Sequence, residues 1–131
     1  MTAATYLDSS ALVKLVIAEP ESASLRRHLG RRRPLVSSAL ARTEVLRALL
    51  DEGPEATGRA HALFGHIDLL RINDRVLDSA GTLRPSHLRS LDAIHLASAL
   101  QLGTDLGTFV SYDQRMLDAA RHLGIKIASP K

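Results

Sequence analysis

The chain has 131 residues, a length that fits one folded domain with a substantial hydrophobic core. Hydrophobic residues make up 45% and charged residues 24%, which is the balance of a globular protein rather than a disordered one. The absence of cysteine excludes disulfides, zinc-thiolate sites and cysteine nucleophiles, and an aromatic content of 3% argues against a single-strand binder that stacks bases. The net charge of +3 suits a polyanionic partner without requiring one.

Short apolar segments and helical patterns alternate along the chain. The predicted strands are residues 3–7, 34–37, 67–72, 108–111 and 125–128. The predicted helices are residues 9–18, 21–29, 39–51, 55–64, 75–83, 88–102 and 114–123. This alternation predicts an α/β fold, a three-layer α/β/α sandwich around a central, mainly parallel sheet. No repeat or linker divides the chain, so we expect residues 1–131 to form a single domain.

Residues that favour helix ends support these boundaries. Pro20 suits the first turn of the second helix, and Ser38 and Asp74 are candidate N-caps. Gly103 and Gly124 stand where helices are expected to stop. No segment has the length of a membrane span, and the N-terminus lacks a signal-like apolar core, so we expect a cytoplasmic protein without membrane contact.

Four carboxylates stand in unusually apolar surroundings. Asp8 directly follows the first predicted strand, and Asp113 follows the fourth. Glu44 and Asp92 fall inside apolar helical stretches. A charge in such surroundings is costly unless it is paired or binds a metal. If the four meet in space, they form an all-oxygen pocket of the kind that holds Mg²⁺ or Mn²⁺, which points towards phosphodiester cleavage.

Asp8 and Asp113 each allow two interpretations. Either carboxylate can serve as the N-cap of the helix that follows it, by accepting hydrogen bonds from backbone N–H groups. Both also stand at carboxyl ends of predicted parallel strands, where ligands bind in open α/β sheets. Parallel strands place both junctions at the same edge of the sheet, which favours a shared site.

Glu44 and Asp92 also have structural alternatives. Glu44 lies outside the capping-box position of its helix, so it is either an exposed partner of Arg42 or Arg47 or part of the acidic site. Asp92 either pairs with Arg89 or interacts with the dipole at the start of its helix. Aspartate is a mediocre helix former, so its presence there calls for a reason.

Two further groups have a structural and a functional interpretation. His95 follows Asp92 by one helical turn and is either a partly buried packing residue or a metal ligand or general base. The arginine-rich segment 26–33 is either solvated surface or a patch that follows a phosphate backbone.

Four segments together resemble a known family. Residues 6–15, YLDSSALVKL, resemble the opening of a PIN domain of the VapC toxin type. Residues 41–45, ARTEV, match its second acidic position. Residues 91–97, LDAIHLA, and 110–116, VSYDQRM, resemble its third and fourth motifs. The likeness follows the family's order and spacing over nearly the whole chain.

The resemblance implies a function. It implies a metal-dependent endoribonuclease that cleaves RNA and leaves a 5′-phosphate and a 3′-hydroxyl. It also implies the toxin of a toxin–antitoxin pair, with Mg²⁺ or Mn²⁺ as cofactor. The expected partners are an RNA substrate, a second copy in a homodimer, and a VapB-like antitoxin whose tail fills the active-site groove.

The resemblance also assigns roles to individual residues. It carries four residues over as the catalytic cluster: Asp8, Glu44, Asp92 and Asp113. Metal binding is assigned to Asp8, Asp113 and Asp92, the last directly or through water, and Glu44 would position or deprotonate the attacking water. Ser10 and Ser111 are expected helpers, and His95 is expected to be structural.

Two other functions stay open from the residues. One is a phosphotransferase of similar α/β fold with Asp8 as nucleophile, although Ser10 stands where the second acid of its usual Asp-x-Asp opening would be. The other is a non-catalytic module that binds nucleic acid or docks an antitoxin. Binding to phosphate alone would not need a group of carboxylates, which repel it unless a metal is present.

Overall fold

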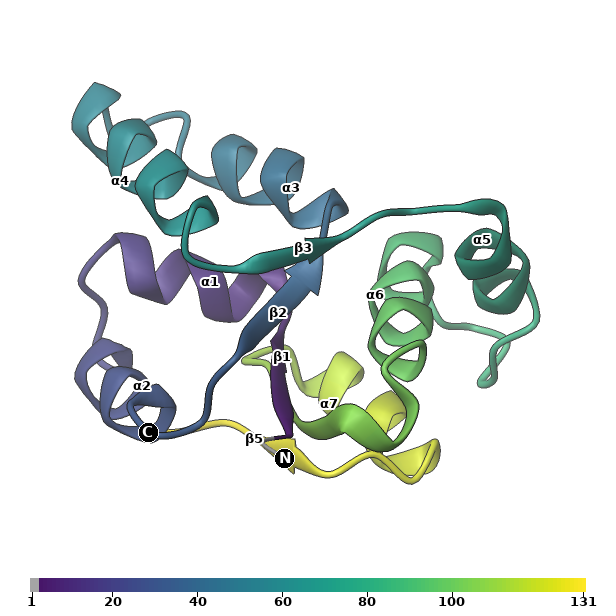
Figure 1. Ribbon diagram of the computed structural model, residues 1–131. Helices are drawn as coiled ribbons and strands as arrows, with labels where there is room; N and C mark the ends of the chain where they lie inside the picture. Colours follow the sequence, from purple (N-terminus) through teal and green to yellow (C-terminus); the bar gives the residue numbers. More distant parts are fainter. Residues whose placement is uncertain (1–2) are drawn as a thin grey trace.

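The computed structural model describes residues 3–131, which fold around one parallel sheet of five strands (Figure 1). The strands are β1 (Ala4–Leu7), β2 (Leu35–Ser38), β3 (Asp68–Leu70), β4 (Leu106–Val110) and β5 (Ile127–Ala128). Their order across the sheet is β3-β2-β1-β4-β5, so the first strand lies at the centre. All four neighbouring pairs are parallel, which confirms the expected α/β class.

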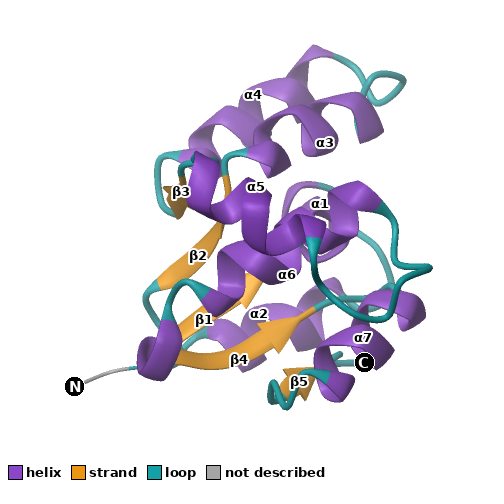
Figure 2. Cartoon of the chain, turned by 90° about the vertical axis from the view of Figure 1, so that its right-hand side faces the viewer, coloured by secondary structure: helices purple, strands orange, loops and turns teal. Residues whose placement is uncertain are grey.

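Helices cover both faces of this sheet. The first face carries α1 (Ser9–Val16), α2 (Ser22–Leu29), α3 (Leu40–Ala48) and α4 (Pro54–Phe64). The second face carries α6 (Ser90–Leu100) and α7 (Gln114–His122), and α5 (Asp74–Gly81) packs on α6. A short 3₁₀ turn, Gly103–Asp105, leads into β4. Figures 1 and 2 show the two helical layers on opposite sides of the strands. Among residues 3–131, no helix is both long and apolar enough to cross a membrane.

Strands β1 and β4 alternate their side chains between two hydrophobic cores, one on each face of the sheet. Tyr6 and Phe109 lie in the core under α6 and α7, and their rings stack with centroids 5.2 Å apart. Leu7 and Val110, the next residues along, lie in the core under α1 to α4. This period of two is what a strand buried on both faces requires. It also fixes the register, because a shift of one residue would exchange the two faces.

The predicted elements all exist, although several are shorter than expected. The predicted strand 67–72 is reduced to β3, because β3 is an edge strand that pairs only with β2, through Asp68, Leu69 and Leu70. The predicted helix 88–102 is reduced to α6. Differences of this size at element ends are expected, because helix ends fray and the periodic pattern does not mark them sharply.

Three of the predicted end residues need correction. Asp74 is not the N-cap of α5: Asn73 is, with its side chain accepting a hydrogen bond from Val76 N at 3.0 Å. Pro20 precedes α2 rather than lying in its first turn. Ser38 ends β2, and although its Oγ accepts from Leu40 N at 3.1 Å, the residue at the cap position of α3 is Ala39.

The glycine predictions are confirmed. Gly103 and Gly124 both adopt positive φ, 55° and 79°, after the helices they follow. Glycine enters this region without the steric cost that a Cβ would impose.

The close approach of β4 to β1 depends on Gly107. A Cβ built there would lie 2.8 Å from Ala3 Cβ and 3.1 Å from Ala4 O. We therefore expect Gly107→Ala to lower the free energy of unfolding by about 1–3 kcal/mol, as overpacking does. Gly58 in α4 is the matched control, because nothing lies within 4 Å of its Cβ position. Gly58→Ala should raise stability by about 0.5–1 kcal/mol. Urea unfolding measures both, and equal effects would contradict the proposed contact.

Candidate active site at the carboxyl edge of the sheet

The candidate site lies where β1 and β4 end side by side. Leu7 of β1 pairs with Val110 of β4, so the chain leaves both strands at the same edge. Asp8 follows Leu7 directly, and Asp113 follows Val110 after two residues. This is the carboxyl edge of a parallel sheet, where the sequence predicted that the two residues would meet.

Asp8 is a buried carboxylate that accepts three hydrogen bonds. Its Oδ1 accepts from Ser10 Oγ at 2.6 Å and from Ala11 N at 3.1 Å, and its Oδ2 accepts from Ser111 Oγ at 2.5 Å. Only 2% of the residue is exposed. Burial raises the pKa of Asp8 above the usual carboxyl value, and the bonds from Ser10 and Ser111 limit that rise. Asp8 is therefore the N-cap of α1 and a constrained buried acid at the same time.

Ser10 and Ser111 connect the two strand ends. Ser10 Oγ accepts a hydrogen bond from Tyr112 N at 3.0 Å, and Ser111 Oγ accepts from Asp113 N at 3.0 Å. Because each hydroxyl accepts from the backbone, its own proton is free to go to Asp8. The two serines thus tie the start of α1 to the loop before α7 and hold the Asp8 carboxylate in one orientation.

Asp113 caps α7 from the exposed rim of the site. Its Oδ1 accepts from Arg115 N at 2.9 Å and from Met116 N at 3.4 Å. Its Oδ2 accepts no hydrogen bond from residues 3–131. The capping interpretation is therefore correct for this residue too, and it leaves one carboxylate oxygen available to a ligand.

Glu44 pairs with a histidine rather than with an arginine. Its Oε1 lies 2.6 Å from His95 Nε2, so of its two interpretations the exposed pairing with Arg42 or Arg47 is wrong. His95 Nδ1 lies 2.8 Å from the Tyr6 hydroxyl. A neutral imidazole that donates from Nε2 to the carboxylate presents Nδ1 as an acceptor for the tyrosine proton. Burial raises the pKa of Tyr6 far above its usual value, so the hydroxyl keeps that proton.

Tyr6 and His95 show what the sequence analysis missed. His95 is only 1% exposed, as a packing residue would be, but both of its ring nitrogens have polar partners. Its position one turn after Asp92 was the available signal. Tyr6 had no signal except that it comes two residues before Asp8, in a strand with few other polar groups.

Asp92 shows that the four carboxylates influence one another. The residue is half-buried in the first turn of α6. Burial raises its pKa, and repulsion from Asp113, Asp8 and Glu44 raises it further, against an opposing effect of His95. All four predicted acidic residues therefore lie in one electrostatic neighbourhood. Asp92 forms no ion pair within residues 3–131, so of its two structural alternatives the pairing with Arg89 is wrong, and its place in the first turn of α6 agrees with the other.

The donor set fits a hard, hydrated divalent cation. Among the described residues, no three histidine or acidic side chains are gathered tightly enough to form a complete metal site. The available donors are nevertheless all oxygens, and Mg²⁺ usually keeps several waters and takes only one or two protein carboxylates. Asp92 and the free Oδ2 of Asp113 meet that need beside Asp8. A cation there would also relieve the repulsion that raises the pKa of Asp92.

The burial of Asp8 predicts a conflict between this site and stability. Because its pKa is raised, the folded state holds the proton more tightly than the unfolded state does. The stability contribution of Asp8 therefore falls as pH rises from about 4, the ordinary carboxyl value, through the folded value. We expect Asp8→Asn, which removes the charge, to melt at a higher temperature than the wild type in EDTA at about pH 7.

The difference in melting temperature should shrink towards about pH 4, where the wild-type acid is protonated. It should also shrink when Mg²⁺ is added at about pH 7, because a cation that binds the folded state stabilises the wild type. Thermal unfolding by circular dichroism measures all three conditions. A variant less stable than the wild type at about pH 7 would contradict the idea that the buried charge is costly.

Comparison with known proteins identifies the family. The PIN domain family model matches residues 5–122. The chain is 59% identical over 128 residues to Ribonuclease VapC46 of Mycobacterium tuberculosis, covering 98% of each chain. Its fold is similar to that of VapC20 of M. tuberculosis, a sarcin-ricin loop cleaving toxin, with a TM-score of 0.77 at 16% identity over 96% of this chain and 99% of that one.

A second solved structure agrees. It is VapBC2 from Rickettsia felis bound to a DNA fragment from its promoter, with a TM-score of 0.73 at 10% identity over 98% of this chain and 99% of that one. At such low identities the two structures establish the fold alone. The family model and the 59% identical relative go further, because each extends over most of the chain. The chain therefore belongs to the PIN-domain family and is of the VapC type.

Proposed function

We propose that this chain is a metal-dependent endoribonuclease and the toxin of a VapBC-type toxin–antitoxin pair. The observation that carries the proposal is the placement of Asp8 and Asp113 at the shared end of β1 and β4, with Asp92 near enough that repulsion from the other three acids adds to the effect of burial on its pKa. A folded protein gains nothing from such repulsion unless a cation is bound. The naming of the 59% identical relative as a ribonuclease supports the same activity.

Each acidic residue has a distinct role in this proposal. Asp8 and Asp113 hold Mg²⁺ or Mn²⁺ directly, and Asp92 holds it directly or through water. Glu44 positions the attacking water or takes its proton. When bound, the cation supplies charge neutralisation at the phosphate and a water that ionises more easily. Ser10 and Ser111 act as helpers because they fix the Asp8 carboxylate.

His95 is a positioning residue for Glu44 in this scheme. The 2.6 Å bond from its Nε2 occupies Oε1 of Glu44 and restricts the rotation of the carboxylate. The Tyr6 hydroxyl at Nδ1 selects the tautomer that carries the proton on Nε2. Second-layer contacts of this kind hold catalytic carboxylates in a productive orientation.

The proposed partners follow from the same assignment. The Rickettsia felis structure is a VapBC complex, which supports a VapB-like antitoxin as partner of this chain. We propose that the tail of this antitoxin fills the active-site groove, that the substrate is RNA, and that residues 1–131 form a single PIN domain that assembles as a homodimer.

The two other functions fit the geometry less well. As a phosphotransferase, the chain would need the second acid of the usual Asp-x-Asp opening two residues after Asp8, where Ser10 stands and donates to Asp8 Oδ1. As a non-catalytic binding module, the chain would place carboxylates where phosphates approach, which opposes binding. Neither alternative explains why the acids are gathered.

Asp8→Asn tests the proposed activity. We expect cleavage of structured RNA in Mg²⁺ or Mn²⁺ by the wild type, and none in EDTA. In the variant the rate should fall by about 10³-fold, the usual loss when a charge-stabilising group is removed. Asp78→Asn, at an exposed position of α5, makes the same chemical change away from the site and should keep full activity. Gel analysis of end-labelled RNA provides the rates, and full activity of Asp8→Asn would refute the assigned site.

Variants of His95 and Tyr6 test the positioning role. His95→Ala should lower the rate of cleavage about 10- to 100-fold, and His95→Gln should recover part of it because the amide can still donate to Glu44. Tyr6→Phe removes only the hydroxyl and should reduce the rate less. Single-turnover kinetics provide the rates, and thermal unfolding separates them from instability. If His95→Gln were no better than His95→Ala at equal folded fractions, the positioning role would be wrong.

A further inference from the structure

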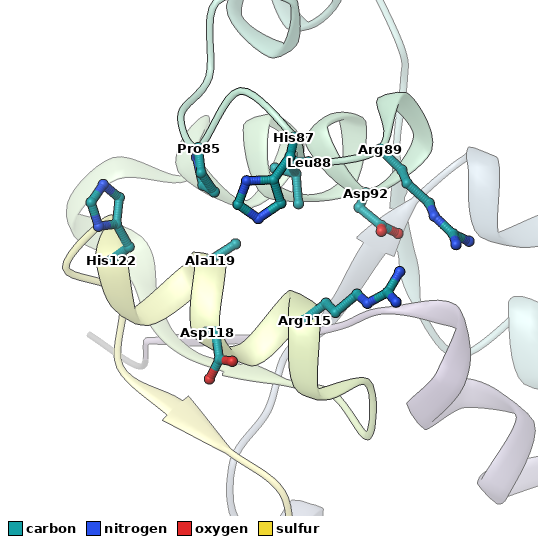
Figure 3. Close-up of a pocket in the computed structure, with 9 residues that line it drawn as sticks. All are labelled: Pro85, His87, Leu88, Arg89, Asp92, Arg115, Asp118, Ala119 and His122. Carbon is teal, nitrogen blue, oxygen red and sulfur yellow. The ribbon is translucent and has the colours of Figure 1, made fainter.

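A hollow of about 450 Å³ opens beside Asp92, between α7 and the segment that leads into α6. Figure 3 shows the residues that line it. They are Pro85, His87, Leu88, Arg89, Asp92, Arg115, Asp118, Ala119 and His122. The volume is in the range of small-ligand sites. Of the four acidic residues of the candidate active site, only Asp92 reaches it.

Two uncommitted arginines stand at the Asp92 end of this hollow. Arg89 is the residue before α6, and Arg115 lies in the first turn of α7. Figure 3 shows their side chains on either side of Asp92. Within residues 3–131, neither guanidinium donates a hydrogen bond or forms an ion pair. A pair of guanidinium groups without a partner among the described residues is a favourable place for a phosphate.

The arginine-rich segment 26–33 is different. Arg26 donates to Leu15 O, Arg27 to Ser24 Oγ and Arg32 to His28 O. Three of its five arginines are thus engaged by the chain itself, which favours the interpretation as ordinary surface. Arg89 and Arg115 are therefore better placed to bind an anion than the arginines of segment 26–33.

The acids in the hollow do not cancel this positive charge. Asp118 accepts a hydrogen bond from Gln114 Nε2 at 2.8 Å and lies 4.0 Å from Arg121 Nη1, so its charge is shared with neighbours on its own helix. Asp92 belongs to the acidic cluster, where a cation is proposed. An RNA phosphate that approaches these carboxylates needs nearby positive charge, and Arg89 and Arg115 supply it.

The rest of the hollow is less polar. Pro85 and Leu88 provide apolar surface, whereas Ala119 is almost fully buried in the core. In Figure 3, His122 lies at the end of the hollow away from Arg115, and His87 lies between these two residues. Imidazole rings and apolar surface are what an unstacked RNA base packs against. The hollow therefore joins a phosphate-binding end to a base-binding end.

We propose that this hollow, the α6–α7 subsite, binds one nucleotide of the RNA strand next to the scissile phosphate. Arg89 and Arg115 hold its phosphate, and its base packs on Pro85 and Leu88 near His87. The inference rests on the proposed ribonuclease function, but nucleotide binding at this place can be measured without cleavage. An acidic peptide is the competing occupant, and it is less favoured because it makes no use of the apolar and imidazole end.

A titration followed by nuclear magnetic resonance tests binding in EDTA. Adenosine 5′-monophosphate should shift the amide signals of Leu88, Arg89, Arg115 and Ala119 in a saturable way, and inorganic phosphate should bind more weakly. The double variant Arg89→Gln/Arg115→Gln should lose this binding. Both side chains are exposed, so the variant should fold normally. Arg75→Gln, an exposed arginine on α5, makes the same change elsewhere and should bind like the wild type.

Three results of the titration would overturn the proposal. The first is a shift pattern centred on other residues, and the second is unchanged binding by the double variant. The third is equal affinity for phosphate and for the nucleotide, which would remove the base-binding end. Displacement of the nucleotide by a glutamate-rich peptide, but not by an RNA oligonucleotide, would favour a protein partner instead.

Cleavage kinetics give a second test. If the subsite binds substrate without taking part in the chemical step, the double variant should raise KM about tenfold or more and leave kcat within about twofold. The plot of log affinity for RNA against log salt should become shallower by about 0.7 for each phosphate that the variant no longer binds. A loss confined to kcat would overturn the binding role. An inactive wild type that still binds the nucleotide here would refute the proposed function and keep the subsite.

Discussion

The three hydrogen bonds to the buried Asp8 carboxylate are the interaction on which the rest of the site depends. They cap α1 through Ala11 N, and through Ser10 and Ser111 they connect the ends of β1 and β4. Burial of a carboxylate is unfavourable, and the hydrogen bonds reduce the cost without removing it, since the pKa stays raised. The fold therefore holds a carboxylate in surroundings that disfavour its charged form.

A second connection joins the two helical layers. Glu44 belongs to α3 over one face of the sheet, and His95 belongs to α6 over the other. The 2.6 Å contact between Glu44 Oε1 and His95 Nε2 connects the two layers at the edge of the sheet. The Tyr6 hydroxyl, on β1, contacts the other ring nitrogen of His95. The candidate active site is thus held from three elements at once. Asp8, Glu44 and His95 are each held by a partner distant in sequence, which restricts their movement.

The chain is positively charged overall, but its candidate active site is acidic. The chain as a whole carries a net charge of +3, yet the candidate active site is acidic. Phosphate would be repelled by the carboxylates alone, so nearby cations must compensate. Free guanidinium groups at Arg89 and Arg115 lie beside the acids, whereas Arg26, Arg27 and Arg32 are bonded to the chain itself. The position of an arginine in the fold, rather than the density of arginines in the sequence, decides whether its guanidinium is available to a phosphate.

The amino-acid sequence by itself determined the α/β class, the order of elements and the four acidic positions, because periodicity and family motifs are local patterns. It also located Asp8 and Asp113 at one edge, since parallel strands share a direction. It did not determine the Asn73 cap, the orientation of Ser10 and Ser111, or the bond between Glu44 and His95. That bond joins side chains 51 residues apart, and the bond from Ser111 to Asp8 spans 103. Only the tertiary structure decides such partners, because they depend on how whole layers pack, and no local pattern records that.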